Sequence, residues 1–222
     1  MRHQGRIGVF VNDLLSPYQV RLFNSIKRAA NSRGVRVIGF QGSFLLQPDQ
    51  EERTPFDGSF IYGLAGEESL DGLIIASGLL SSRAGIDAVH ELCRKSKLPV
   101  VSIGRLPGVP GIEIGCDDAL MLLVNHLVQF HGRRKIVIIE GPQGNPDNIE
   151  RGRIVRGALA ALNVPLPESH VLPGDFLETS GAQAVRILLD QRGIAPGDFD
   201  AVFALNHEYA TRASSCCQRE AR

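Results

Sequence analysis

The sequence has no excess of charge of either sign, since Lys+Arg and Asp+Glu each total 24 among 222 residues. Proteins that bind nucleic acids usually carry a basic excess, because neutralising backbone phosphates supplies much of their affinity. The charge balance therefore excludes an obvious nucleic-acid-binding surface, and we expect no direct nucleic-acid contact from this chain.

Long apolar runs and paired cysteines are also missing. No stretch reaches the roughly 18 apolar residues of a membrane-spanning helix, and only a short polar lead precedes the first apolar run. The cysteines show neither CxxC pairs nor disulfide-like spacing. They are Cys93, Cys116, Cys216 and Cys217. These absences predict a cytoplasmic protein with reduced thiols and no membrane contact.

Motifs for catalysis are absent as well. The sequence contains no GxSxG, HExxH or GxxxxGK[ST] pattern, and its first apolar run leads into Asn12–Pro17 without the glycines of a dinucleotide site. The histidines do not cluster with Cys or carboxylates at metal-ligand spacing. His126 and His131 are five positions apart, off a shared α-helical face, and are interpreted as ordinary surface histidines. We expect no catalytic residues, no cofactor and no metal site.

What the sequence does contain is a regular alternation of short apolar runs with segments of helical period. Apolar runs predict strands at 6–11, 35–40, 73–76, 99–103, 112–114, 135–139 and 201–205. Helical periodicity predicts helices at 17–32, 84–96, 117–129, 149–162 and 180–191. Ser16-Pro17 is a helix-start signal, a hydroxyl cap followed by proline. This order predicts an α/β fold with parallel sheets between helices.

A stretch rich in Pro and Gly at 106–111 divides this alternation into two halves. We therefore expect two Rossmann-like lobes, an N-terminal lobe at 6–110 and a C-terminal lobe at 111–206. The βα pattern stops after Asn206, so the second lobe is predicted to be incomplete. Residues 207–222 form an atypical tail without a convincing apolar face.

Polar residues recur where the predicted strands end, which is where open α/β sheets bind ligands. They are Asn12, Asp13 and Ser16 after the first strand, Gln41 after the second, Ser77 after the third, Arg105 after the fourth, and Asn206 after the last. This recurrence predicts a ligand site built from strand ends.

Several segments, taken in order, resemble the effector-binding domain of the LacI/GalR family. They are IGVFVNDLLSPYQVRLFNSIKRAANSRGVRVIGF, LDGLIIASG, LPVVSIGR, the block from IGCDD to NVPLP, GDFLETSGAQAVRILL and FDAVFALN. The resemblance covers about residues 6 to 206. It implies a type 1 periplasmic-binding-protein-like fold. HGRRK and EGPQGNPDNIER look closer to family members without a helix-turn-helix that serve as sensor modules of signalling proteins.

The resemblance implies that the lobes close on a small polar ligand, such as a sugar or nucleobase. It also implies a homodimer as one possible assembly of the chain. Ser16 and Tyr18 match positions that approach the ligand in the family, Arg151 matches an arginine that clamps it, and Asp117 matches a crossover aspartate. Alternatives remain for three of them. Tyr18 could pack in the core beside Pro17, Arg151 could pair with Glu150 or Asp147, and Asp117 could cap a helix.

The sequence departs from the family in three places. No helix-turn-helix precedes the first strand, Asn206-His207 stands where the family has Asn-Asp, and the βα units that complete the second lobe are absent. The tail TRASSCCQREAR resembles no family segment. We hypothesise that a frameshift or an early stop truncated a longer product near Tyr209.

Three other functions remain open at this stage. A solute-binding protein that feeds a transporter would need a secretion signal. An enzyme on a doubly wound sheet stays open because a fold does not fix its chemistry. A truncated fragment that binds nothing is the third alternative.

Overall fold

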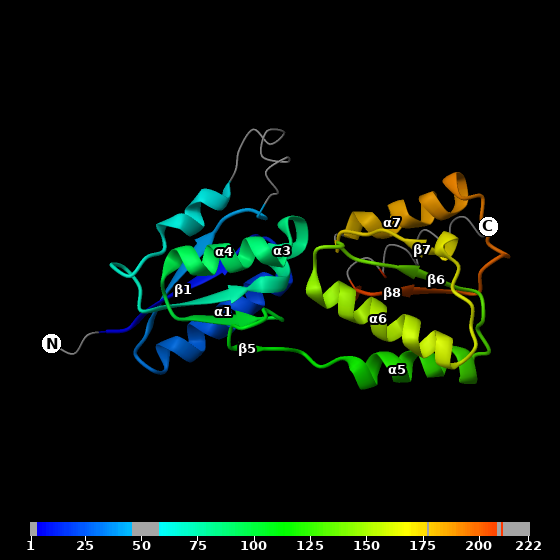
Figure 1. The fold of residues 1–222 in the computed structure, drawn as a ribbon, viewed down its shortest axis with the longest axis horizontal. Helices are drawn as coiled ribbons and strands as arrows, with labels where there is room; N and C mark the ends of the chain where they lie inside the picture. Colours follow the sequence, from blue (N-terminus) through cyan, green and yellow to red (C-terminus); the bar gives the residue numbers. More distant parts are fainter. Residues whose placement is uncertain (1–3, 46–57, 177, 208–209, 211–222) are drawn as a thin grey trace. The chain divides into compact units, whose positions relative to one another are not determined.

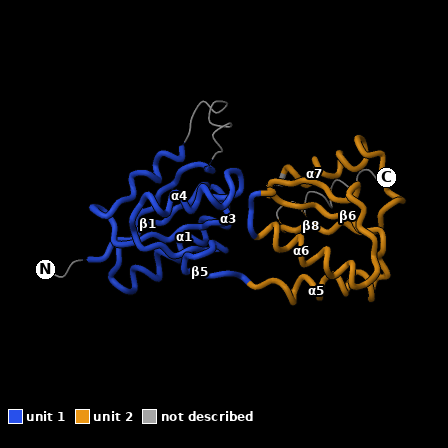
Figure 2. The backbone as a smooth tube through the Cα atoms, viewed as in Figure 1, with its two compact units in different colours: residues 1–114, 144–146 blue, residues 115–143, 147–222 orange. Residues whose placement is uncertain are grey.

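The computed structural model describes residues 4–45, 58–176, 178–207 and 210 (Figure 1). These residues belong to two compact units, drawn in different colours in Figure 2. Unit 1 comprises Met1–Ile114 and Gly144–Pro146, and unit 2 comprises Gly115–Gln143 and Asp147–Arg222. Most of the predicted tail at 207–222, including Cys216 and Cys217, lies outside the described residues.

Unit 1 is built on a five-stranded parallel sheet in the order β2-β1-β3-β4-β5. The strands are β1 (Arg6–Val11), β2 (Arg36–Gln41), β3 (Gly72–Ala76), β4 (Val100–Ile103) and β5 (Gly111–Ile112). Because every pair is parallel, all five carboxyl ends lie along one edge of the sheet, the edge at which such sheets bind ligands.

Helices cover both faces of this sheet. They are α1 (Pro17–Asn31), η1 (Gly58–Leu64), α3 (Ser77–Ala84) and α4 (Ile86–Ser96). Phe10 and Ile75 from the strands form one core with Leu80 of α3 and Val89 of α4, all fully buried. The helix α1 lies on the opposite side, where Phe23 packs closely over Gly39 of β2 (Figure 1).

Unit 2 contains a three-stranded parallel sheet in the order β7-β6-β8 within the described part of the chain. Its strands are β6 (Ile136–Ile139), β7 (Val171–Leu172) and β8 (Ala201–Ala204). Its helices are α5 (Asp117–Asn125), η2 (His126–Phe130), α6 (Pro146–Ala161), η3 (Glu168–His170), α7 (Glu178–Arg186) and η4 (Ile187–Gln191).

The central strand β6 divides the core of unit 2 into two layers, because successive side chains of a strand point to opposite faces. Ile136 and Ile138 pack with residues of α5, η2 and α6. Val137 and Ile139 pack with residues of α7 and η4. Figure 1 shows α5 and α6 on one side of this sheet and α7 on the other. The predicted sandwich of helices around parallel sheets is confirmed.

Element boundaries differ from the sequence prediction where the backbone turns. The helix predicted from Ala84 is preceded by α3, and Gly85 with φ 80° separates it from α4. The helix predicted from residue 149 begins at Pro146, and β7 was not predicted. Ser16 was predicted to cap α1 through its hydroxyl, but its side chain makes no capping bond. Its carbonyl oxygen accepts from the N–H of Val20 at 3.0 Å instead.

Among the described helices, none combines the length and the apolar character that a membrane crossing requires.

Candidate functional site

The loop after β1 is fixed by a buried glutamine. Gln19, in the first turn of α1, is 4% exposed, and its Oε1 accepts hydrogen bonds from the N–H groups of Asn12 and Asp13, both at 3.1 Å. The Oδ1 of Asp13 accepts from the N–H of Leu15 at 2.7 Å. The Oδ1 of Asn12 is buried and has no hydrogen-bond partner among the described residues. A buried amide oxygen in that state is costly, so this loop holds an unused acceptor near the carboxyl edge of the sheet.

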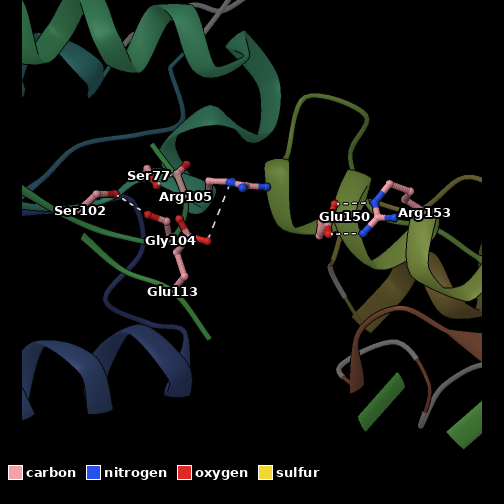
Figure 3. Close-up of polar contacts among 7 residues, drawn as sticks. All are labelled: Ser77, Ser102, Gly104, Arg105, Glu113, Glu150 and Arg153. Atoms are coloured by element: carbon pink, nitrogen blue, oxygen red, sulfur yellow. Dashed lines mark hydrogen bonds and ion pairs between the residues drawn. The ribbon is translucent and has the colours of Figure 1, made fainter. Parts of the chain in front are cut away.

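Two serines fix the ends of β3 and β4: Ser77 links the end of β3 to the end of β4, and Ser102 bonds within the turn after β4, as Figure 3 shows in part. The fully buried Ser77 has its Oγ 3.4 Å from the carbonyl oxygen of Ile103 and 3.3 Å from that of Arg105. Ser102 donates from Oγ to the carbonyl oxygen of Gly104 at 2.8 Å. Gly104 has φ 95°, and a Cβ there would lie 3.1 Å from the Oγ of Ser77.

The side chain of Arg105 extends away from these hydrogen bonds and is exposed. Its Nε lies 3.9 Å from Oε2 of Glu113, and both side chains are more than half exposed (Figure 3). An exposed pair at this distance is weak, so a ligand with paired hydroxyls or a carboxylate can compete for the guanidinium.

The end of β2 is supported by Tyr62, a residue that was not predicted from the sequence. Its ring is 1% exposed, and its hydroxyl lies 3.0 Å from the carbonyl oxygen of Val11 and 2.9 Å from that of Ser43. Gly42 lets the ring approach, because a Cβ at that position would lie 2.5 Å from it. Gln41, just before this glycine, has an exposed side chain.

The two residues assigned from the family's first turn lie at the start of α1. Ser16 is half-buried, and Tyr18 is 39% exposed. Packing of Tyr18 in the core, the alternative considered from the sequence, is therefore wrong.

In unit 2 the structure places Arg151 and the end of β8 together. The Nη1 of Arg151 donates to the carbonyl oxygen of Leu205 at 3.0 Å, and the N–H of Leu205 donates to the carbonyl oxygen of Ile139 at 3.0 Å. Asn206 follows directly. Arg151 and Asn206, two of the three predicted residues of unit 2, therefore lie at the carboxyl edge of its sheet.

An ion pair between Arg151 and Glu150, one of the alternatives considered for Arg151, is not formed among the described residues. Glu150 instead accepts two hydrogen bonds from Arg153, at 2.9 and 2.6 Å (Figure 3). These bonds raise the pKa of the Arg153 guanidinium above its usual value. Arg153 binds the Glu150 carboxylate. Arg151 is oriented instead by the neutral carbonyl group of Leu205.

The turn between β6 and α6 is pinned by Asn148, which is 4% exposed. Its Oδ1 accepts from the N–H of Gly141 at 2.6 Å, and its Nδ2 donates to the carbonyl oxygens of Gly141 and Pro142 at 3.1 and 3.2 Å. Glu140, at the end of β6, forms an ion pair with Arg156. Asn148 and Glu140 were not predicted from the sequence, although both are polar residues that follow or face a strand end.

Asp117 lies apart from these strand ends. It is the exposed first residue of α5, and Cys116 occupies the capping position. The alternative in which Asp117 caps α5 is therefore wrong, because the cap is the preceding residue. An acidic residue in the first turn still stabilises the helix through its interaction with the helix dipole.

The described residues offer little for catalysis. They contain no group of three or more His, Cys, Asp and Glu side chains that could hold a metal ion. Burial raises the pKa of the Cys93 thiol to about 11, which leaves it protonated and weakly nucleophilic at neutral pH.

Two parallel-sheet units, each with polar groups fixed at the carboxyl edge, define an α/β fold of the periplasmic-binding-protein-like kind found in LacI-family regulators. The chain matches the structure of a "transcriptional regulator CelR-cellobiose complex" with TM-score 0.77 and 26% identity, over 98% of this chain and 63% of that one. It matches a LacI family regulator from Mycobacterium smegmatis with TM-score 0.77 and 20% identity, over 96% and 72%.

Curated proteins give the same picture at the level of sequence. The HTH-type transcriptional regulator CelR of Thermobifida fusca is 35% identical over 146 residues, 64% of this chain and 40% of the relative. Catabolite control protein A of Priestia megaterium is 26% identical over 191 residues, 83% and 52% of the two chains. The chain thus spans about half the length of these relatives. By name they are regulators, not enzymes. No protein-family profile matches the chain.

Proposed function

We propose that this chain is the effector-binding domain of a LacI-type transcriptional regulator and that it binds a small sugar. The observation that carries the proposal is the placement of Arg151, whose guanidinium is held by the Leu205 carbonyl at the carboxyl edge of the unit 2 sheet, beside Asn206. The relatives named above support the class of function.

The chemistry of Arg151 suits a sugar. A guanidinium carries five N–H donors in a rigid plane and accepts no hydrogen bonds. One donor is engaged by Leu205, which fixes the plane, and the remaining donors match the spacing of adjacent sugar hydroxyls. A mobile lysine in the same place would have to be ordered on binding, at a cost in affinity.

The ends of the unit 1 strands supply the complementary groups. Asn12 offers an amide oxygen that has no partner among the described residues, and Arg105 offers a weakly held guanidinium. A hydroxyl donates to the first and accepts from the second, so a polyhydroxylated ligand can satisfy both. The proposed ligand-binding residues are Asn12, Asp13, Ser16, Tyr18, Gln41, Ser77, Arg105, Asp117, Arg151 and Asn206.

The choice of sugar follows two solved relatives. One is the CelR–cellobiose complex, and another is a LacI family regulator from Enterococcus faecium with bound ribose, which matches this chain with TM-score 0.69 and 22% identity. We propose that binding favours a closed arrangement of the lobes at 6–110 and 111–206, which requires different affinities for the open and closed states. Cytoplasmic location, a homodimer and the lack of DNA contact by this segment complete the proposal.

A thermal-shift scan tests the proposal with cellobiose, ribose, other mono- and disaccharides, and nucleosides. A ligand at about 100 times its dissociation constant stabilises by about 2.7 kcal/mol. For a chain of this size that raises the Tm by roughly 5–11 °C. Arg151→Ala should lose the shift, and the control Arg153→Ala should keep it, because Arg153 is exposed and pairs with Glu150. If no sugar shifts a cooperative transition, or if both variants respond alike, the proposal is wrong.

A further inference from the structure

Two histidines that the sequence separates by five positions meet at the end of the helical segment formed by α5 and η2. The Nε2 atoms of His126 and His131 lie 3.0 Å apart, and both side chains are exposed. The N–H of His131 donates to the carbonyl oxygen of His126 at 3.1 Å, and Gly132 follows with φ 65°. A π-type turn therefore brings together two rings that an α-helical spacing would separate, and such turns are frequent at functional sites.

The same turn occurs a second time in unit 2 without histidines. The N–H of Arg192 donates to the carbonyl oxygen of Ile187 at 3.0 Å, and Gly193 follows with φ 64°. This backbone closure therefore ends two helical segments of unit 2, η2 and η4. Of the two turns, the one that ends η2 also brings two imidazole rings together, so the pair does not follow from the backbone closure itself.

A third ring helps to position the pair. Phe130, which is 77% exposed, stacks on His126 with centroids 5.0 Å apart and an interplanar angle of 11°. It meets His131 edge-on at 5.0 Å and 88°. Both geometries are favourable for aromatic pairs, so Phe130 restricts the rotation of both imidazoles.

We propose that His126 and His131 form a binding site for a divalent transition-metal ion that prefers imidazole, such as Zn²⁺. Zinc–nitrogen bonds are about 2.0–2.1 Å long, so two adjacent nitrogen ligands at angles of 90–110° lie about 2.9–3.4 Å apart. The observed 3.0 Å falls within that range. A small rotation of either exposed ring directs both lone pairs at one ion.

The remaining coordination positions go to water, because the described residues offer no third His, Cys, Asp or Glu around this pair. In the metal-free chain the Nε2–H of one neutral ring donates to the Nε2 of the other. When both rings coordinate through Nε2, each stays neutral and carries its single proton on Nδ1, so the donor ring changes tautomer and no proton leaves the pair. Two imidazoles with water favour Zn²⁺, Ni²⁺ or Cu²⁺ over Mg²⁺ and Ca²⁺, which prefer oxygen ligands.

Calorimetric titration of the full-length chain with Zn²⁺ tests the site. Thiolates also bind zinc, so the parent protein carries Cys216→Ser and Cys217→Ser. His126→Gln and His131→Gln should each weaken zinc binding by about tenfold or more, as loss of one of two chelating ligands requires. His90→Gln, on α4 of unit 1, is the control and should bind zinc as the parent does.

A second measurement locates the ion directly. In imidazole NMR spectra of the parent, Zn²⁺ should shift the resonances of His126 and His131 and leave those of His90 and His170 in place, while Mg²⁺ shifts none. Equal zinc affinity in the parent and both variants would overturn the proposal, and so would shifts confined to other histidines. Loss of sugar binding is not expected in either variant, so the two proposals fail independently.

Discussion

The guanidinium of Arg151 donates to the backbone carbonyl oxygen of Leu205, two residues that lie 54 positions apart in the sequence. The bond joins the start of α6 to the end of β8 and fixes the plane of the guanidinium. The role proposed for residue 151 therefore requires the planar shape of the guanidinium as well as its positive charge.

Replacing Arg151 with lysine separates these two properties. Arg151→Lys keeps the positive charge but loses the planar fork, so we expect the affinity for the sugar identified by the thermal scan to fall by about tenfold, or about 1.4 kcal/mol. Isothermal calorimetry gives the dissociation constants, with Arg153→Lys as the matched control. Equal affinities for Arg151→Lys and the parent would mean that charge alone acts at this position.

Two glycines test how strongly the β3–β4 tie depends on close packing. Gly104 and Gly108 both have positive φ, 95° and 75°, so alanine strains the backbone at either position. Only at Gly104 would the new Cβ also press on Ser77, at 3.1 Å, whereas nothing lies within 4 Å at Gly108. We expect Gly104→Ala to lower the free energy of unfolding by about 1 kcal/mol more than Gly108→Ala does. Urea denaturation followed by circular dichroism measures both, and equal losses would contradict this account of Gly104.

Asn148 tests the turn between β6 and α6. Asn148→Asp keeps the acceptor for the Gly141 N–H but replaces two donated bonds with a carboxylate that faces carbonyl oxygens. We expect a loss of about 2–4 kcal/mol at neutral pH, because the group is buried. Protonating the new carboxyl restores one donor, so the loss should shrink as the pH falls. Asn24→Asp, on the exposed side of α1, serves as the control and should change little.

Cys93 should resist alkylation at neutral pH. Burial raises the pKa of its thiol to about 11, so about a thousandth of it is thiolate at pH 8. We expect iodoacetamide to label Cys116 before Cys93, and the Cys93 rate to rise about tenfold per pH unit up to pH 11. Peptide mass spectrometry follows each cysteine separately. Because the folded state holds the proton more tightly, stability should decline as the pH rises between the ordinary thiol pKa and 11. A Cys93 rate that levels off near pH 9 would contradict the raised pKa.

Most strands were predictable because they are short, mainly apolar runs, and the clearest is β6, where all four residues are buried. The strand β7 escaped prediction because it has two residues, flanked by His170 and Pro173. Such a short strand is defined by its partner, β6, rather than by its own sequence. The fold class could therefore be predicted from the local sequence pattern, whereas the shortest strand, β7, could not.

The site was predictable only in part. Strand-end residues such as Asn12 follow from the positions of the strands, whereas Gln19 does not, since a polar residue in a first helical turn is normally exposed. Its burial arises because the β1–α1 loop folds back over it. An α-helical period predicted that His126 and His131 lie on different faces of a helix. The π-type turn between these two residues, followed by Gly132, brings their rings together instead.

The segment Gly144–Pro146 belongs to unit 1, although its neighbours on both sides belong to unit 2. Within unit 1, the Nδ2 of Asn145 donates to the carbonyl oxygen of Gly78 at 2.6 Å. A gene segment that encodes only residues 6–110 would leave Asn145 behind, and Gly78 would lose this donor. A first lobe exchanged on its own would meet a foreign residue at this position, so we expect positions 78 and 145 to diversify together.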